Sequence, residues 1–581
     1  MSRFTARPVI MGTHGVVTTG HYLATSAGLR ILHEGGNAVD AGVAAGFCLA
    51  VLEPQLNGIG GEVPILVYSA KRGSVSAISG QGTAPRRATI EWFREQAIDL
   101  IPGDGLLPAT VPGAFDGWVT ALREFGTMSL AQVLSPAVEL AESGFPMYSG
   151  LRNVLLANVE KFQAEWPTSA EAFLPDGKVP DIGEVYRQPV WATAFRKVLE
   201  AERKAARLGR EAGLQAARDC FYRGEIAERI ADFAGSTEVK DAAGQAHRGL
   251  LEYQDLAGYH AKVEDPVTTS YRGCQVCKCG PWCQGPVFLQ QLNLLEGLDL
   301  AALGHNSADY IHTVVEAAKL AFADREAYYG DPEFDDVPLE VLLSKEYADR
   351  RRELINPTEA SGDFRPGDVG RGPLAYDPSG ARIAGADSAG DTTHLDVIDS
   401  AGNMFSATPS GGWLMSSPAV EGLGFPLGTR GQMFFLDPGR PNALQPGKRP
   451  RTTLTPSLAL KDGRPFMAFG TPGGDMQDQW TLQFFLNVVD FGMDLQEAVE
   501  APTFHTQHFP SSFYPRAMYP KRVVLEDRIP ESVRDELGRR GHEIVVAGPW
   551  SNGRVLGIQI RGGVMLGAAS PRMETGYAAG W

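Results

Sequence analysis

The stretch AGDTTHLDVIDSAGNMFSATPS, residues 389–410, decides how this chain is organised. LDVID and NMFSAT alternate apolar and polar residues on either side of a short turn at 400–402, which predicts a β-hairpin. When the two strands are paired around that turn, Thr392 lies across from Ser410. The sequence therefore predicts two hydroxyl groups that face each other at the open end of the hairpin, although an ordinary polar cross-strand pair would look the same.

The segment just before this hairpin has the composition of a linker. Residues 356–391 are rich in Gly, Pro, Asp and Ser and contain few large apolar side chains, so we expect a flexible linker that ends at Asp391. A threonine hydroxyl is a poor nucleophile without an adjacent base, but the free α-amine of a chain that begins with that threonine can serve. Cleavage between Asp391 and Thr392 by an N→O acyl shift would create such a terminus. The plainer alternative is that a β-branched threonine simply begins a strand.

Composition limits the classes of protein to which the chain can belong. Its 581 residues are 43% hydrophobic and 21% charged, as in ordinary globular proteins. The net charge of −16 argues against nucleic acid and anionic membrane surfaces as main partners. No signal peptide and no membrane-spanning stretch is evident, so a cytoplasmic location is expected.

The pattern of elements differs between the two ends of the chain. The first part is predicted to be helices separated by Gly-rich turns, and the Ala- and Val-rich helix after Asn37 is expected to be buried on all sides. Beyond the linker the pattern is mostly hairpins, for example SLAL with PFMAF and RVLGIQI with VMLGA, together with one helix over 476–491. A mostly antiparallel sheet covered by helices, an α+β fold, is the prediction.

A glycine pair follows one of these predicted strands. Gly473 and Gly474 lie between the strand at 466–469 and the helix at 476–491. Backbone N–H groups exposed there, beside a helix start, could hold the negative oxygen of a tetrahedral intermediate. A plain turn or a phosphate site are the alternatives, but the chain has no GxxxxGK[ST], GxGxxG or GxSxG motif.

Four of the six cysteines lie close together in CQVCKCGPWC, at Cys274, Cys277, Cys279 and Cys283. Thiolates at short spacing suit zinc or an iron–sulfur cluster. No second cluster or spaced histidine pair follows, so packed or free thiols are the favoured interpretation and no metal is expected.

Nine longer motifs run in order along almost the whole chain. In the first part they are GGNAVDAGVAA (35–45), EPQLNGIGGE (53–62), PATVPGAFDGW (108–118) and FGTMSLAQVLSPAVELAESGF (125–145). In the last part they are DTTHLDVIDSAGN (391–403), PGKRPRTTLTPSL (446–458), GTPGG (470–474), APTFH (501–505) and ASPR (569–572). Together they resemble the γ-glutamyltransferase family of N-terminal-nucleophile hydrolases.

The resemblance implies a fold, a division of the chain and a set of roles. The fold would be an αββα sandwich built from a large fragment, 1–391, and a small one, 392–581, that stay together as a heterodimer. Thr392 would be the nucleophile, with its own amine as base, and Ser410 would hydrogen-bond it. Gly473 and Gly474 match the pair that forms the oxyanion hole. No metal or organic cofactor is implied.

The resemblance is weaker at the positions that would hold a γ-glutamyl substrate. The hydroxyl pair persists as Thr452 and Thr453, and Gln432 is kept, but Phe435 stands where an acidic partner for the α-amine is expected. A cationic amine at Phe435 would lose water without gaining a partner, which costs on the order of a few kcal/mol. Ile90 stands where an arginine for the α-carboxylate is expected.

New positive charges could replace that arginine. Arg430, two residues before Gln432, could bind a substrate carboxylate or form a surface salt bridge, and Arg87 and Arg451 are further candidates. An acyl group with a carboxylate but no α-amine would suit an arginine and two threonines, as in the branch that contains cephalosporin acylases and oxamate amidohydrolases.

We therefore predict an amidase or acylase that acts on a small-molecule amide through an acyl–Thr392 ester. The alternatives are a true γ-glutamyl transferase or glutathione hydrolase and, in a different class, a non-catalytic or metal-carrying relative that uses the four clustered cysteines.

Overall fold

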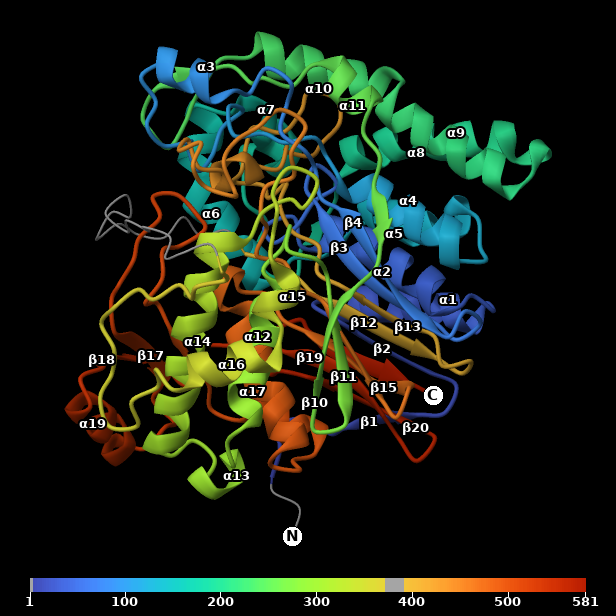
Figure 1. Ribbon diagram of the computed structural model, residues 1–581. Coiled ribbons are helices and arrows are strands. Elements are labelled where there is room, and N and C mark those ends of the chain that lie inside the picture. The colour runs from blue at the N-terminus through green and yellow to red at the C-terminus, as the bar shows by residue number, and fades with distance from the viewer. Residues whose placement is uncertain (1–3, 371–390) are drawn as a thin grey trace.

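The computed structural model describes residues 4–370 and 391–581. Two seven-stranded antiparallel sheets lie face to face at its centre (Figure 1). The first sheet runs β1 (Ile10–Gly12), β20 (Val564–Ala569), β19 (Leu556–Arg561), β15 (Arg464–Gly470), β14 (Ser457–Lys461), β11 (Cys274–Lys278) and β10 (Val267–Tyr271). The second runs β21 (Tyr577–Gly580), β2 (Gly15–Thr19), β12 (Leu395–Asp399), β13 (Met404–Ala407), β3 (Val63–Ser69), β4 (Ser74–Gly80) and β9 (Lys262–Glu264).

Helices cover the outer face of each sheet. Against the second sheet pack α1 (Tyr22–His33), α2 (Ala38–Leu52) and α4 (Ala114–Phe125), with α5 (Leu130–Ser143), α8 (Pro189–Ala205), α9 (Arg210–Tyr222) and α10 (Glu225–Ser236) beyond them. Against the first sheet pack α12 (Gly285–Glu296), α17 (Gln477–Val489) and α18 (Leu495–Glu500), with α14 (Ala308–Tyr328) and α16 (Lys345–Arg352) outside them. The layer order is thus helix, sheet, sheet, helix, and the predicted αββα sandwich is confirmed.

Smaller elements complete the chain. The remaining helices are α3 (Ile90–Glu95), α6 (Ser149–Ala164), α7 (Pro167–Phe173), α11 (Tyr253–Ala257), α13 (Leu300–Leu303), α15 (Leu339–Leu342) and α19 (Glu531–Arg539). Outside the two large sheets lie the strands β5 (Phe145–Pro146), β6 (Val185–Tyr186), β7 (Val239–Lys240), β8 (Ala246–His247), β16 (Phe504–Thr506), β17 (Arg522–Glu526) and β18 (Glu543–Ala547). Within the described residues, no helix is both long and apolar enough to cross a membrane.

The hairpin predicted at the opening stretch forms with the predicted register. Leu395 pairs with Ala407 and Ile398 with Met404, and the hairpin is central in its sheet because β2 and β3 flank it. The hairpins β14–β15 and β19–β20 and the helix α17 also lie where the sequence predicts them. The α2 helix is buried at every position, as expected from its composition.

The expectation that the first part of the chain is helical is wrong at β2, β3 and β4. These strands supply part of the sheet that carries the 395–407 hairpin. Six of the seven residues of β3, Val63–Ser69, are buried, so the strand lacks the alternation of a half-exposed strand. Short apolar runs of this kind do not reveal whether they form strand or helix.

Both sheets contain strands from before and after Asp391, so neither part of the chain has a complete sheet of its own. Of the predicted linker, residues 356–370 are described, and 371–390 lie outside the described residues. From 356 to 370 the chain lies against α14, where the Gly367 N–H donates to Asp324 Oδ1 at 2.7 Å and the Tyr328 hydroxyl donates to the Gly367 carbonyl.

Candidate active site

The two hydroxyl groups predicted to face each other are in contact. Thr392 and Ser410 form an antiparallel bridge just beyond the ends of β12 and β13, and their Oγ atoms are 3.0 Å apart. Thr392 is 2% exposed and Ser410 is fully buried. The hairpin register places them, and the glycines Gly411 and Gly412, both with positive φ, turn the chain away directly afterwards.

The peptide bond before Thr392 is held on both sides. The Asp391 carbonyl oxygen accepts hydrogen bonds from Ser410 Oγ at 3.0 Å and from the indole Nε1 of Trp413 at 2.6 Å. The Asp391 side chain accepts from the Thr392 backbone N–H at 2.9 Å and forms an ion pair with Arg554. Three polar groups therefore fix the peptide bond at which cleavage was predicted, and Arg554 holds the Asp391 side chain.

Arg430 lies behind the hydroxyl pair and is 1% exposed, so it is not a surface residue. Its Nε forms an ion pair with Glu62, and its Nη2 donates to Ser410 Oγ at 2.7 Å. Its guanidinium also lies 5.0 Å from the centre of the Trp413 ring. Burial raises the pKa of Glu62, and the charge of Arg430 opposes that rise. One nitrogen of Arg430, Nη1, has no hydrogen-bond partner among the described residues.

A second buried carboxyl group, Glu53, lies near this site and was not identified from the sequence. It follows α2, is 2% exposed, and faces the hydroxyl of Thr393, the residue after the candidate nucleophile. Burial raises the pKa of Glu53 to about 7, although the Thr393 hydroxyl and the charge of Arg554 oppose the rise. Its position in EPQLNGIGGE marks a motif, but a motif does not show that a carboxyl group is buried.

The glycine pair adopts backbone conformations that L-residues rarely take. Gly473 has φ of 126° and Gly474 has φ of 54°, at the turn between β15 and α17. A Cβ on Gly473 would overlap the ring of Trp480, and one on Gly474 would lie 3.0 Å from the ring of Phe513. The Phe513 ring in turn lies 6.3 Å from that of Trp413, centre to centre, which brings the glycine turn toward Thr392.

Thr452 and Thr453 are buried, and neither hydroxyl has a hydrogen-bond partner among the described residues. Gln284 connects them to the glycine turn, because its backbone N–H donates to the Thr452 carbonyl at 2.9 Å and its side chain contacts the Gly474 carbonyl at 3.5 Å. An unpaired buried hydroxyl is costly, so the two threonines are suited to a ligand that would satisfy them.

Gln432 and Phe435 have different surroundings. The Gln432 side chain binds three backbone groups, the Gly103 carbonyl at 3.0 Å, the Thr429 carbonyl at 3.2 Å and the Tyr514 N–H at 3.0 Å. The Phe435 ring lies between two guanidinium groups, with Arg440 at 4.3 Å and Arg516 at 4.1 Å from the ring centre. The position where a carboxylate was expected is thus apolar and has positive neighbours.

The remaining positions considered for a substrate carboxylate have other surroundings. Ile90 is buried in an apolar cluster at the start of α3. Arg87 is about half exposed and lies 3.8 Å from Glu252. Arg451 is buried and bound to Glu326 at 2.7 Å.

The four clustered cysteines do not form one site. Cys274 packs in the core on the helix side of the first sheet, whereas Cys277, Cys279 and Cys283 pack between the two sheets. Burial raises the pKa of Cys277 to about 12 and also raises that of Cys279, so these thiols stay protonated. A metal site needs thiolates, and packed thiols are the better description.

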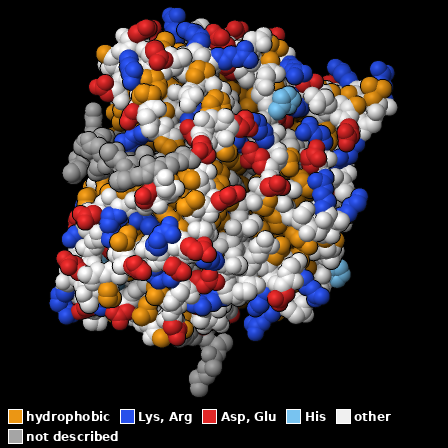
Figure 2. Space-filling view, in the orientation of Figure 1, with side chains coloured by type: hydrophobic (Ala, Val, Ile, Leu, Met, Phe, Trp, Pro, Cys, Tyr) orange, Lys and Arg blue, Asp and Glu red, His pale blue; other side chains and the backbone are white. Residues whose placement is uncertain are grey.

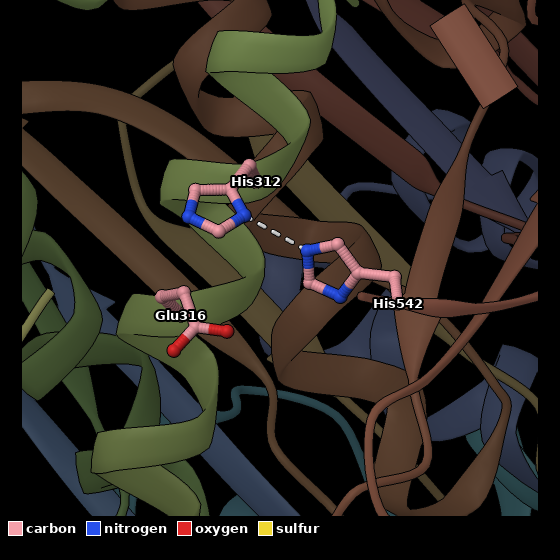
Figure 3. Close-up of side chains that lie close together, drawn as sticks. All are labelled: His312, Glu316 and His542. Atoms are coloured by element: carbon pink, nitrogen blue, oxygen red, sulfur yellow. Dashed lines mark hydrogen bonds between the residues drawn. The ribbon is translucent and has the colours of Figure 1, made fainter. Parts of the chain in front are cut away.

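Within the described residues, one group combines ligand types suited to a metal: His312 and Glu316 on α14 with His542 (Figure 3). The two imidazoles are hydrogen-bonded, with His312 Nδ1 2.9 Å from His542 Nε2. Both oxygens of Glu316 are already paired with cations, Oε1 with Lys319 at 2.6 Å and Oε2 with Arg365 at 3.3 Å. A divalent metal would meet two positive side chains there, so the group is better suited to anchoring the chain after α16 than to binding a metal.

The surface does not single out a charged partner. On the face drawn in Figure 2, acidic and basic side chains are interspersed, although the net charge of the chain is −16. Many of them are partners in exposed ion pairs, such as Lys197 with Glu225 at 2.8 Å.

Comparisons with known proteins show the family and agree with the fold. A family model described as Gamma-glutamyltranspeptidase matches residues 24–580. The chain is 35% identical to the Acylase ACY 1 proenzyme of Pseudomonas sp. (strain SE83), over 92% of this chain and 88% of that one. A solved structure of LmbA2991T421A is 47% identical with a TM-score of 0.95, and each chain is fully covered. The cephalosporin acylase from Bacillus halodurans is 32% identical with a TM-score of 0.84, covering 100% of this chain and 98% of that one. The chain belongs to the gamma-glutamyltranspeptidase family of hydrolases and acylases.

Proposed function

We propose that this chain is a self-processing amidohydrolase or acylase that cuts itself between Asp391 and Thr392. The observation that carries the proposal is the contact among three groups: Thr392 Oγ lies 3.0 Å from Ser410 Oγ, which in turn lies 3.0 Å from the Asp391 carbonyl oxygen. A nucleophile, its hydroxyl partner and the carbonyl to be attacked are thus assembled in the uncut chain. The relative named Acylase ACY 1 proenzyme supports a precursor that is processed.

Cleavage would give a large fragment, 1–391, and a small fragment, 392–581. Because both sheets combine strands from both fragments, the fragments would remain associated as a heterodimer. The new α-amine of Thr392 would then act as the base for its own hydroxyl, which attacks the substrate amide and forms an acyl–Thr392 ester. The backbone N–H groups of Gly473 and Gly474 would hold the oxyanion, and water or an acceptor amine would release the acyl group.

The substrate we propose is a small-molecule amide whose acyl group carries a carboxylate but no α-amine. The unpartnered hydroxyls of Thr452 and Thr453 and the remaining nitrogen of Arg430 are donors that a carboxylate could accept. Phe435 offers an ammonium group no carboxylate of its own, and its ring has two guanidinium neighbours, of which Arg440 lies 3.6 Å from Asp437. Gln432 would shape this part of the pocket by fixing the backbone around it.

Denaturing gels with intact-mass measurement test the processing step. Wild-type protein is expected as two fragments of residues 1–391 and 392–581, and the Thr392→Ala variant as one uncut chain. A wild-type protein that stays whole and active, or a Thr392→Ala variant that is still cut, would refute the proposal. Thr393→Ala is the matched control, because it removes a neighbouring hydroxyl and should be cut normally.

The second candidate function is a true γ-glutamyl transferase or glutathione hydrolase, which the description of the matching family favours. Release of p-nitroaniline from glutaryl-p-nitroanilide and from its γ-glutamyl counterpart separates the two, since the substrates differ only in the α-amine. We expect the glutaryl compound to have the higher kcat/KM. A clear preference for the γ-glutamyl compound would establish the second candidate.

A further inference from the structure

The oxygen of the peptide bond before Thr392 has two hydrogen-bond donors of different kinds. One is the Ser410 hydroxyl at 3.0 Å, and the other is the indole N–H of Trp413 at 2.6 Å. The same N–H also reaches the Leu56 carbonyl at 2.8 Å, so its bond is shared between two acceptors. Two donors that converge on one carbonyl oxygen are the arrangement that stabilises a negative charge when that carbonyl is attacked.

The hydrogen bonds of Ser410 determine which way the protons point. Its oxygen accepts from Arg430 Nη2 at 2.7 Å, and a guanidinium can only donate. The single Ser410 proton is directed to the Asp391 carbonyl, so the Thr392 hydroxyl must donate to Ser410 rather than accept from it. The Thr392 oxygen therefore has its lone pairs free in the uncut chain.

We propose that Trp413 is a catalytic residue of self-cleavage, and that its indole N–H and the Ser410 hydroxyl together form an oxyanion hole for the Asp391 carbonyl. The inference rests on the proposed function, because it requires that the chain cuts itself at Thr392. It assigns to self-cleavage an oxyanion hole separate from the one proposed at Gly473 and Gly474 for substrate turnover.

The chemistry balances without an external base. The Thr392 oxygen forms a bond to the Asp391 carbonyl carbon, and the π electrons of that carbonyl move onto its oxygen. As negative charge develops on that oxygen, the Trp413 N–H and the Ser410 hydroxyl stabilise it. The Ser410 proton then passes to the oxygen, and the Thr392 proton replaces it on Ser410. The C–N bond then breaks as the proton on the oxygen returns to the Thr392 nitrogen, which leaves an ester and a free amine. Water hydrolyses the ester to the Asp391 carboxyl group and the Thr392 hydroxyl.

The indole is held in place from both sides. Its N–H is shared with the Leu56 backbone, and its ring lies 5.0 Å from the Arg430 guanidinium and 6.3 Å from the Phe513 ring. The side chain is 4% exposed. A donor fixed before the reaction needs no reorganisation when charge develops, which is the condition under which such a donor is most effective.

The test is the rate of self-cleavage of the full chain, followed on denaturing gels from the end of cell-free synthesis. Trp413→Phe keeps an aromatic ring beside Arg430 but removes the N–H, and should slow cleavage by about 100-fold or more. Trp282→Phe is the matched control, because this buried indole donates to Glu264 at 2.6 Å, away from Asp391, and the variant should be cut at the wild-type rate.

The outcomes separate the two proposals. If Thr392→Ala stays uncut but Trp413→Phe is cut at the wild-type rate, the role of Trp413 is wrong and the proposed function stands. If Thr392→Ala is cut, both fail. Equal slowing in Trp282→Phe would also overturn the inference, because it would show a general effect of losing an indole. If Trp413→Phe does not fold, Trp413 is replaced by benzothienylalanine, which keeps the ring shape and lacks only the N–H. The rate of self-cleavage of that protein should then be about 100-fold lower than the wild-type rate, and an unchanged rate would overturn the inference.

Discussion

Replacing Glu53 by glutamine should change how the stability of the protein depends on pH. Glu53 is 2% exposed, and burial raises its pKa from 4.5 to about 7. The folded protein therefore binds a proton at this group more readily than the unfolded chain does. The stability that this group contributes is fully present below pH 4.5 and is lost as the pH rises through about 7.

The size of the effect follows from the shift. The pKa of Glu53 rises by roughly 2.5 units, and each unit corresponds to about 1.4 kcal/mol. The largest change in the free energy of unfolding from this group is therefore about 3 kcal/mol. Between pH 5 and pH 8 the group titrates through most of that range, so wild-type stability should fall by about 2 to 3 kcal/mol from this cause alone. Glutamine does not titrate, so the free energy of unfolding of Glu53→Gln should not fall for this reason. Relative to wild type, the variant should therefore become more stable by about 2 to 3 kcal/mol as the pH rises from 5 to 8.

The measurement is the free energy of unfolding in urea at pH 5 and pH 8. It should be made in a Thr392→Ala background, so that every sample is one uncut chain with the same Asp391 peptide bond. Glu34→Gln is the matched control, because Glu34 also follows a helix, α1, but is exposed and should leave the pH dependence unchanged. If Glu53→Gln and its parent lose stability in parallel between pH 5 and pH 8, then Glu53 is not a buried neutral acid and the reasoning is wrong.

Four further substitutions test other parts of the molecule. Gly473→Ala should lower kcat by about 100-fold or more. The added Cβ would overlap the Trp480 ring, and alanine does not favour the positive φ at this position, so the backbone and its proposed oxyanion donors would shift. Steady-state kinetics of the processed enzyme measure the effect. Thr452→Val and Thr453→Val should each raise KM for a carboxylate-bearing substrate by about 10-fold without loss of stability, since within 4–370 and 391–581 their hydroxyls have no partner to lose. Steady-state kinetics and thermal unfolding check both expectations. Lys278→Met should destabilise the protein by about 3 to 5 kcal/mol, because it leaves the buried carboxyl of Asp478 without its cation at 3.0 Å. Urea unfolding measures the loss, and an unfolding midpoint equal to that of the wild type would contradict the ion pair.

The hairpin and the hydroxyl pair could be predicted from the sequence because both depend on local patterns. Alternating residues around a short turn fix the strand register, and that register alone places Thr392 opposite Ser410. The sandwich was implied by motifs that resemble a family, and the structure confirms it. The strand β3 was missed because burial on both faces removes the alternation that marks a strand.

The partners of the hydroxyl pair could not be predicted, because they come from distant parts of the chain. Glu62 lies 368 residues before Arg430, and no local pattern connects them. The sequence offered Arg430 as a substrate ligand or as a surface salt bridge, and the fold excludes the surface alternative by burying it beneath Ser410. Trp413 gave no signal at all, since an indole N–H becomes a catalytic donor only when a carbonyl oxygen lies within its reach.

The charges around Phe435 illustrate why residue identity and fold must be combined. Phenylalanine at 435 shows only that the expected acidic residue is absent, which could mean that an α-amine is bound elsewhere. The fold adds two guanidinium groups, those of Arg440 and Arg516, stacked on that ring, and leaves a nitrogen of Arg430 without a partner. An ammonium group would be repelled where a carboxylate would be attracted, because like charges in a partly buried site raise each other's free energy. The proposed preference for an acyl group without an amine therefore rests on the guanidinium groups near Phe435 as well as on the loss of one carboxylate.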